Sequence, residues 1–100
     1  MIATDDIRAL ELYELALSLV EASGTPVSGS TLVEYRARNL TIHYSAKTGH
    51  LEVWHLRKVL TVKRLPRSLK VTHYTPGEWE DDLEAAATLI PRGGEGTSKL

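Results

Sequence analysis

The histidines are the first residues of this chain whose side chains could do chemistry, because imidazole serves as a general base and as a metal ligand near neutral pH. His55 and His73 are predicted on one face of two strands that run in the same direction. With one strand between them, their Cβ atoms lie roughly 10 Å apart, twice the spacing of neighbouring strands. A metal ion needs three or four converging ligands, so we predict no metal site. We expect both imidazoles to hydrogen-bond to the backbone at the rim of the core, whereas His43 points to the other face.

Motifs for nucleophilic catalysis and for phosphate binding are missing from the sequence. None of the seven serines stands in a G-x-S-x-G turn, there is no cysteine, and the glycine cluster at 93–96 precedes no helix. The acid pairs at 5–6 and 81–82 fall in first turns of predicted helices, where the helix dipole stabilises them without any catalytic role. We therefore predict a non-enzymatic protein without a cofactor. A small hydrolase or isomerase using His55 or His73 is the least favoured alternative.

Four alternating runs, rich in β-branched and aromatic residues, predict an antiparallel meander. They cover residues 40–44, 51–55, 59–63 and 69–74, and turn-forming residues separate them. A further alternating run at 32–38 predicts a first strand, which its inserted charges place at an edge of the sheet. The sheet is therefore expected to have four or five strands.

Helical patterns flank this meander on both sides. Apolar residues at spacings of three and four predict a helix over 5–22, with a stripe made of Ile7, Leu10, Tyr13, Leu17 and Val20 and widened by Leu12, Ala16 and Leu19. Thr75 to Glu78 reads as a capping box that opens a second helix, which ends at Pro91. Residues 92–100 have no apolar periodicity and predict a disordered tail. The expected fold is thus a single α+β domain over residues 1–91, followed by a flexible tail at 92–100.

Alternation along the strands sorts their side chains onto two faces. The first face is strongly apolar and is expected to form the core under the helices. The second face combines aromatic, aliphatic and basic side chains, and its candidate partner-binding residues are Trp54, Leu56, Val59, Tyr74, His43, Arg36, Lys63 and Lys70. Either the second helix or the tail covers this patch in a three-layer core, or the patch is an exposed interaction surface.

Charge is segregated along the chain although the net charge is only −1. Residues 30–74 carry nine Lys or Arg against two acids, whereas residues 1–29 carry five acids against one Arg and residues 75–100 six acids against two basic residues. In one interpretation the acidic helices neutralise the basic sheet. In the other, the basic sheet surface stays open for an anionic partner.

The sequence favours a small binding protein that acts through the second sheet face, on a protein partner or on a second copy in a homodimer. The alternative is a nucleic-acid-binding module in which the basic sheet contacts phosphates while Trp54, Tyr74 and His43 stack on unpaired bases. The absence of cysteine, of a signal peptide and of a long apolar segment favours a cytoplasmic protein with no membrane contact.

Overall fold

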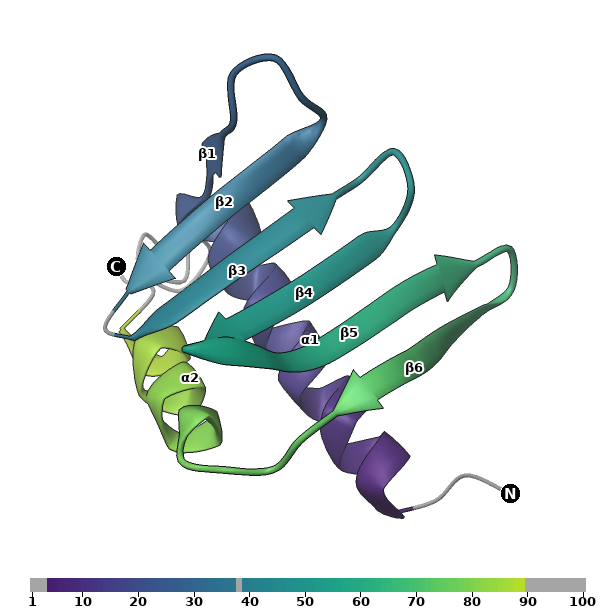
Figure 1. The fold of residues 1–100 in the computed structure, drawn as a ribbon, viewed down its shortest axis with the longest axis vertical. Helices are drawn as coiled ribbons and strands as arrows, with labels where there is room; N and C mark the ends of the chain where they lie inside the picture. The colour runs from purple at the N-terminus through teal and green to yellow at the C-terminus, as the bar shows by residue number, and fades with distance from the viewer. Residues whose placement is uncertain (1–3, 38, 90–100) are drawn as a thin grey trace, which may run out of the picture.

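The computed structural model describes residues 4–37 and 39–89, which form two helices and a six-stranded antiparallel sheet (Figure 1). In chain order the elements are α1 (Thr4–Ser23), β1 (Thr25–Pro26), β2 (Leu32–Ala37), β3 (Leu40–Ser45), β4 (His50–His55), β5 (Arg57–Leu65), β6 (Ser68–Tyr74) and α2 (Trp79–Thr88). The strands lie side by side in the order β1 to β6. The predicted α+β class is confirmed, with one strand more than expected because the two-residue β1 pairs with β2. The predicted tail at 92–100 lies outside the described residues.

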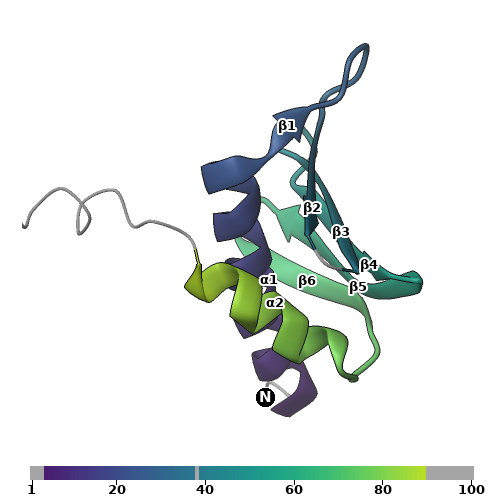
Figure 2. The same ribbon diagram turned by 90° about the vertical axis from the view of Figure 1, so that its left-hand side faces the viewer.

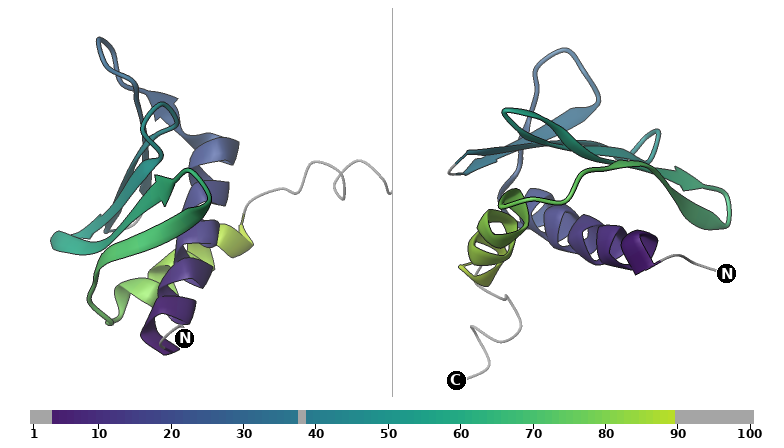
Figure 3. Two further views of the ribbon diagram at one scale, coloured as in Figure 1. Left: turned by 90° about the vertical axis from the view of Figure 1, so that its right-hand side faces the viewer. Right: turned by 60° about the horizontal axis from the view of Figure 1, so that its bottom comes forward.

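Both helices pack on the same face of the sheet (Figures 2 and 3). α1 runs beneath the strands from β2 to β6, and α2 lies beside α1 at the end where β6 leaves the sheet. The core between the two layers contains Leu12, Leu19, Ile42, Leu51, Val53, Leu60, Val62, Trp79 and Leu83 among others. We call the opposite side of the sheet the open face, because no helix of the described chain lies on it. The three-layer arrangement with α2 on that side is therefore wrong.

The buried stripe of α1 is centred on the residues that were expected to widen the apolar stripe. Its buried residues are Ala9, Leu12, Tyr13, Ala16, Leu19 and Val20, whereas Ile7 is 51% exposed. Gly24 ends the helix, and its backbone N–H donates to the Val20 carbonyl at 2.8 Å. A Cβ atom on Gly24 would lie 2.5 Å from a side-chain carbon of Val33. Glycine is therefore required where α1 turns back toward the sheet.

α2 begins later than the predicted capping box. Its N-cap is Glu78, whose side chain makes no capping hydrogen bond. Thr75 instead contributes its backbone carbonyl, which accepts a 2.6 Å hydrogen bond from Nε1 of Trp79. Because Trp79 is almost completely buried, its docking in the core fixes where the helix starts. The prediction that Thr75 caps the helix is wrong for this reason.

Two β-bulges change the faces of residues in β5 and β6. Val53 pairs with Leu60 and Trp54 with Lys58, so Val59 is an extra residue in β5. Thr61 pairs with His73 and Val62 with Val71, so Thr72 is an extra residue in β6. A bulge shifts the alternation of side chains by one position. Val59 and Tyr74, both predicted on the second face, consequently lie on the helix side, and their assignment to the binding surface is wrong.

Among the described residues, no helix has the length and apolar character needed to cross a membrane.

Candidate functional site

The open face presents three rows of side chains that run across the strands. Directly paired residues form a central row made of Glu34, His43, Glu52, Thr61 and His73. The row toward the β4–β5 turn contains Arg36, Thr41, Trp54 and Lys58. The row toward the β3–β4 turn contains Leu32, Ser45, His50, Lys63 and Lys70. Five of the eight predicted binding residues thus share this face: Trp54, His43, Arg36, Lys63 and Lys70.

Trp54 is the aromatic side chain of the row beside the β4–β5 turn, and it is 37% exposed. Its indole Nε1 donates to Oε1 of Glu52 at 3.2 Å. The Nζ atom of Lys58, its neighbour on β5, lies 5.8 Å from the ring centroid, within the range of a cation–π contact. Trp54 therefore lies where the sequence placed it, and two polar neighbours hold the ring in position.

Two imidazole–carboxylate pairs occupy the middle of the open face. Nε2 of His43 lies 2.8 Å from Oε2 of Glu34, and Arg36 adds an ion pair to the same carboxylate at 3.2 Å. The hydrogen bond from His43, helped by the positive charge of Arg36, holds the pKa of Glu34 below its usual range. His50 pairs in the same way with Glu52 at 3.1 Å. His50 and Glu52 were not among the predicted binding residues. Glu52 falls on the predicted strand at 51–55, on the same face as Trp54, whereas His50 falls in the predicted turn before it and becomes the first residue of β4 in the structure.

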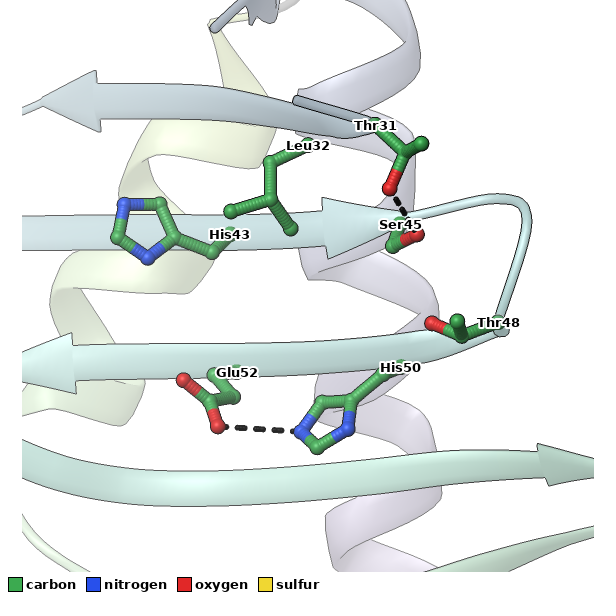
Figure 4. A pocket seen from close by; sticks show the side chains of 7 residues that line it. All are labelled: Thr31, Leu32, His43, Ser45, Thr48, His50 and Glu52. Carbon is green, nitrogen blue, oxygen red and sulfur yellow. Dashed lines mark hydrogen bonds and ion pairs between the residues drawn. The ribbon is translucent and has the colours of Figure 1, made fainter. Parts of the chain in front are cut away.

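A depression with a volume of about 320 Å³ opens between the ends of β2, β3 and β4 (Figure 4). Its lining residues are Thr31, Leu32, His43, Ser45, Thr48, His50 and Glu52. The hydroxyl of Ser45, a residue that is almost completely buried, lies 3.1 Å from the hydroxyl of Thr31. The depression therefore combines two imidazoles, one carboxylate, three hydroxyls and one aliphatic wall.

Leu56, another of the predicted binding residues, forms the tip of the β4–β5 turn. It is 96% exposed, and its φ angle of 70° lies in the left-handed region that glycine and asparagine tolerate better than leucine. Leu56 was expected on the second sheet face with Trp54, but it lies in the turn, outside both β4 and β5, so that placement is wrong.

Direct ion pairs join the two helices to each other more than they join the helices to the sheet. Arg8 on α1 forms ion pairs with two acids of α2: its Nε lies 2.9 Å from Glu80 and its Nη2 lies 2.6 Å from Glu84. These carboxylates raise the pKa of Arg8 further above its ordinary value. Between the described helices and strands the one ion pair is the 3.5 Å contact of His55 with Asp82. Within the described chain Lys63 and Lys70 have no carboxylate partner.

The remaining histidines lie on opposite faces rather than on one face as predicted. His55 points to α2, and His73 lies on the open face because of the bulge at Thr72. Nε2 of His73 donates to the backbone carbonyl of Lys58 at 3.1 Å, which confirms the predicted backbone hydrogen bond for this residue. In the part of the chain that the structure describes, no three His or acidic side chains are grouped closely enough to hold a metal ion.

Comparison with protein-family models, with curated proteins and with solved structures finds no match to this chain.

Proposed function

We propose that this protein is a small binding module that uses the open face of its sheet to hold an acidic surface of a protein partner. One observation carries the proposal: α1 and α2 pack on the other face, so Trp54 stays 37% exposed beside basic side chains. Tryptophan and arginine are enriched among the residues that dominate binding energy at protein interfaces. On the open face Trp54 and Arg36 belong to the same cross-strand row.

The Trp54 side chain is arranged for binding before any partner arrives. Its Nε1–H is bound by Glu52 and its ring lies under the ammonium group of Lys58. A side chain that is already held in one position loses little conformational entropy when a partner covers it. The exposed part of the ring can therefore serve as a rigid apolar anchor.

The conformation of Leu56 supports a contact at the same end of the sheet. A left-handed conformation costs an L-residue about 1–2 kcal/mol, and a glycine would avoid that cost. Leu56 recovers little of it inside the folded chain, since 96% of its surface is exposed. Backbone strain of this kind is concentrated at functional sites, where the side chain is needed for something other than the fold. A partner that covers Trp54 and extends past the turn would bury Leu56 as well.

The charges of the open face favour an acidic partner. Lys63 and Lys70 are direct cross-strand neighbours, and like charges in such positions repel each other. Carboxylates on the partner would relieve this repulsion and would steer the encounter, because complementary potentials raise association rates.

The nucleic-acid alternative receives less support from the geometry. It relied on Trp54 and Tyr74 as stacking residues, but Tyr74 lies on the helix side and bonds to Glu80. Glu34 and Glu52 stand in the middle of the open face, where they would repel a phosphate backbone. An acidic protein surface can place its carboxylates over the lysines and apolar groups over Trp54.

Site-specific photo-cross-linking in cells of the source organism tests the proposal. A photoreactive residue replaces Thr41, which is next to Trp54 on the open face, and in a matched control it replaces the exposed Ser18 on α1. We expect discrete protein adducts from position 41, few from position 18, and loss of the adducts when Trp54→Ala is added.

The identity of the adduct separates the possible partners. An acidic protein supports the proposal, and an adduct between two copies identifies the second copy as the partner. Sedimentation of the purified wild type and of Trp54→Ala across concentration then measures that self-association. Adducts that nuclease removes would establish the nucleic-acid alternative instead, and equal adducts from both positions would rule out the open face as the binding surface.

A further inference from the structure

The depression lined by His43, Ser45 and His50 lies in a different part of the open face from Trp54. Ser45 and His50 are cross-strand neighbours at the β3–β4 turn, whereas Trp54 is near the other end of β4. Trp54 and Leu56 do not line the depression. The depression shares Glu52 with the surroundings of Trp54 and lies beside Lys63, but its own lining forms a distinct concave site whose chemistry can be considered by itself.

We propose that this depression binds a small neutral polyol, such as one ring of a sugar. Its volume of about 320 Å³ is at the lower end of the range of small-molecule pockets, which suits a single ring. Figure 4 shows β3 and β4 contributing from adjacent strands, with His43 across from Glu52 and the hydroxyls of Ser45 and Thr48 at the turn end. These groups surround one open space into which a ligand could fit.

When they are neutral, the two imidazoles each keep one hydrogen-bond acceptor, on the ring nitrogen that the carboxylate does not bind. An ionised carboxylate can only accept, so Glu34 and Glu52 fix the proton of each neutral ring on Nε2. The Nδ1 atom of each ring then keeps a free lone pair. Together with the carboxylate of Glu52, these atoms make the lining rich in acceptors.

The charges around the depression disfavour ionic ligands of either sign. Glu52 in the lining and Glu34 behind His43 repel an anion. Lys63, the cross-strand neighbour of His50, and Lys58, which is 3.8 Å from Glu52, repel a cation. A neutral ligand is repelled by neither set of charges. A polyol is neutral and carries many hydrogen-bond donors, which the acceptors of the lining can bind.

The remaining lining groups fit the same class of ligand. The hydroxyls of Thr31, Ser45 and Thr48 can each donate or accept, so they can pair with hydroxyls in any orientation. Leu32 provides an aliphatic wall against which the C–H groups of a sugar ring can pack. A free sugar and the terminal sugar of a glycan present the same groups to this depression.

Two-dimensional amide NMR on the full chain tests the inference with defined probes. The neutral probes are glucose and its disaccharide maltose, the anionic probe is inorganic phosphate, and the cationic probe is putrescine. We expect saturable shifts of the amides of Ser45, Thr48 and His50 with the neutral probes, and none with phosphate or putrescine. Equal affinity for glucose and maltose would indicate a free sugar, and tighter binding of maltose a glycan terminus.

Matched variants connect the shifts to the lining. Thr48→Ala and His50→Ala should each weaken glucose binding roughly fivefold, the effect of losing one hydrogen bond. Thr41→Ala, which removes a hydroxyl from β3 outside the depression, should leave the affinity unchanged. The inference is overturned if no neutral probe gives saturable shifts, if phosphate or putrescine binds better than glucose, or if neither lining variant weakens binding.

Discussion

The hydroxyl of Tyr74 donates a 2.8 Å hydrogen bond to Oε2 of Glu80, which ties the end of β6 to the first turn of α2. The other oxygen of the same carboxylate accepts a 2.9 Å bond from Arg8, so that α1 joins the network. The Tyr74 ring also packs edge-on against Trp79, with 6.2 Å between the centroids. One carboxylate thus connects both helices to the last strand.

Removal of the Tyr74 hydroxyl should destabilise the protein without changing its fold. We expect Tyr74→Phe to lower the free energy of unfolding by about 1.5–3 kcal/mol, the size of a hydrogen bond to a charged group. Urea denaturation of wild type and variant measures the difference. Tyr35→Phe is the matched control, because no hydrogen bond of the Tyr35 hydroxyl is found in the described chain. Equal losses for both variants would contradict the role of the Tyr74–Glu80 bond.

Acid should weaken the fold through Glu80. Burial raises the pKa of this carboxyl, but the hydrogen bonds from Tyr74, Arg8 and the Gly77 N–H outweigh burial and leave the pKa below its ordinary value. A lowered folded-state pKa means that the stabilisation is present above the unfolded-state pKa of about 4.3 and is lost as the pH falls through the folded-state pKa.

We expect the urea concentration at the unfolding midpoint of the wild type to decrease as the pH is lowered below about 4.3. In Glu80→Gln this decrease should be smaller. The pKa of Glu34 is also lowered, so Glu34→Gln is a useful comparison on the exposed side of the sheet. An unchanged acid dependence in Glu80→Gln would show that this carboxyl does not titrate at a lowered pKa.

Substitution of the two tryptophans by alanine should change the stability of the fold by very different amounts. Trp79 is 1% exposed and fills the core, so Trp79→Ala should cost about 3–5 kcal/mol and leave the chain largely unfolded. Trp54→Ala should change stability by less than about 1 kcal/mol, because its ring is partly in water and few core contacts are lost. Thermal melts followed by circular dichroism compare them. Unfolding of Trp54→Ala would make Trp54 a core residue and would remove the anchor of the proposed interface.

Replacing Leu56 by glycine should stabilise the isolated protein. The φ angle of 70° favours glycine by about 1–2 kcal/mol, and Leu56 has almost no buried surface to lose. Thermal melting should therefore rise for Leu56→Gly while partner cross-linking from position 41 falls. Val27→Gly, a change in another loop with an ordinary backbone angle, should destabilise instead. A lower melting temperature for Leu56→Gly would mean that the leucine serves the fold.

The sequence by itself determined the types of the main elements and the segregation of charge. Alternation over 40–44 and 51–55 places His43 and Trp54 on the face opposite Ile42 and Val53, and in the structure they lie there. The spacing of apolar residues likewise predicted a helix near 5–22, and α1 covers Thr4–Ser23. These features depend on local backbone geometry, which a run of neighbouring residues is enough to specify.

Only the tertiary structure decided which face the residues after each bulge occupy. Alternation holds while the pairing register is continuous, and the extra residues Val59 and Thr72 interrupt it without a signature in composition. Tyr74 turned to Glu80, and α2 started at Trp79, because those contacts bring together segments that pattern analysis treats separately. The depression between β2, β3 and β4 arises in the same way, since cross-strand pairing alone places His43, Ser45 and His50 around one space.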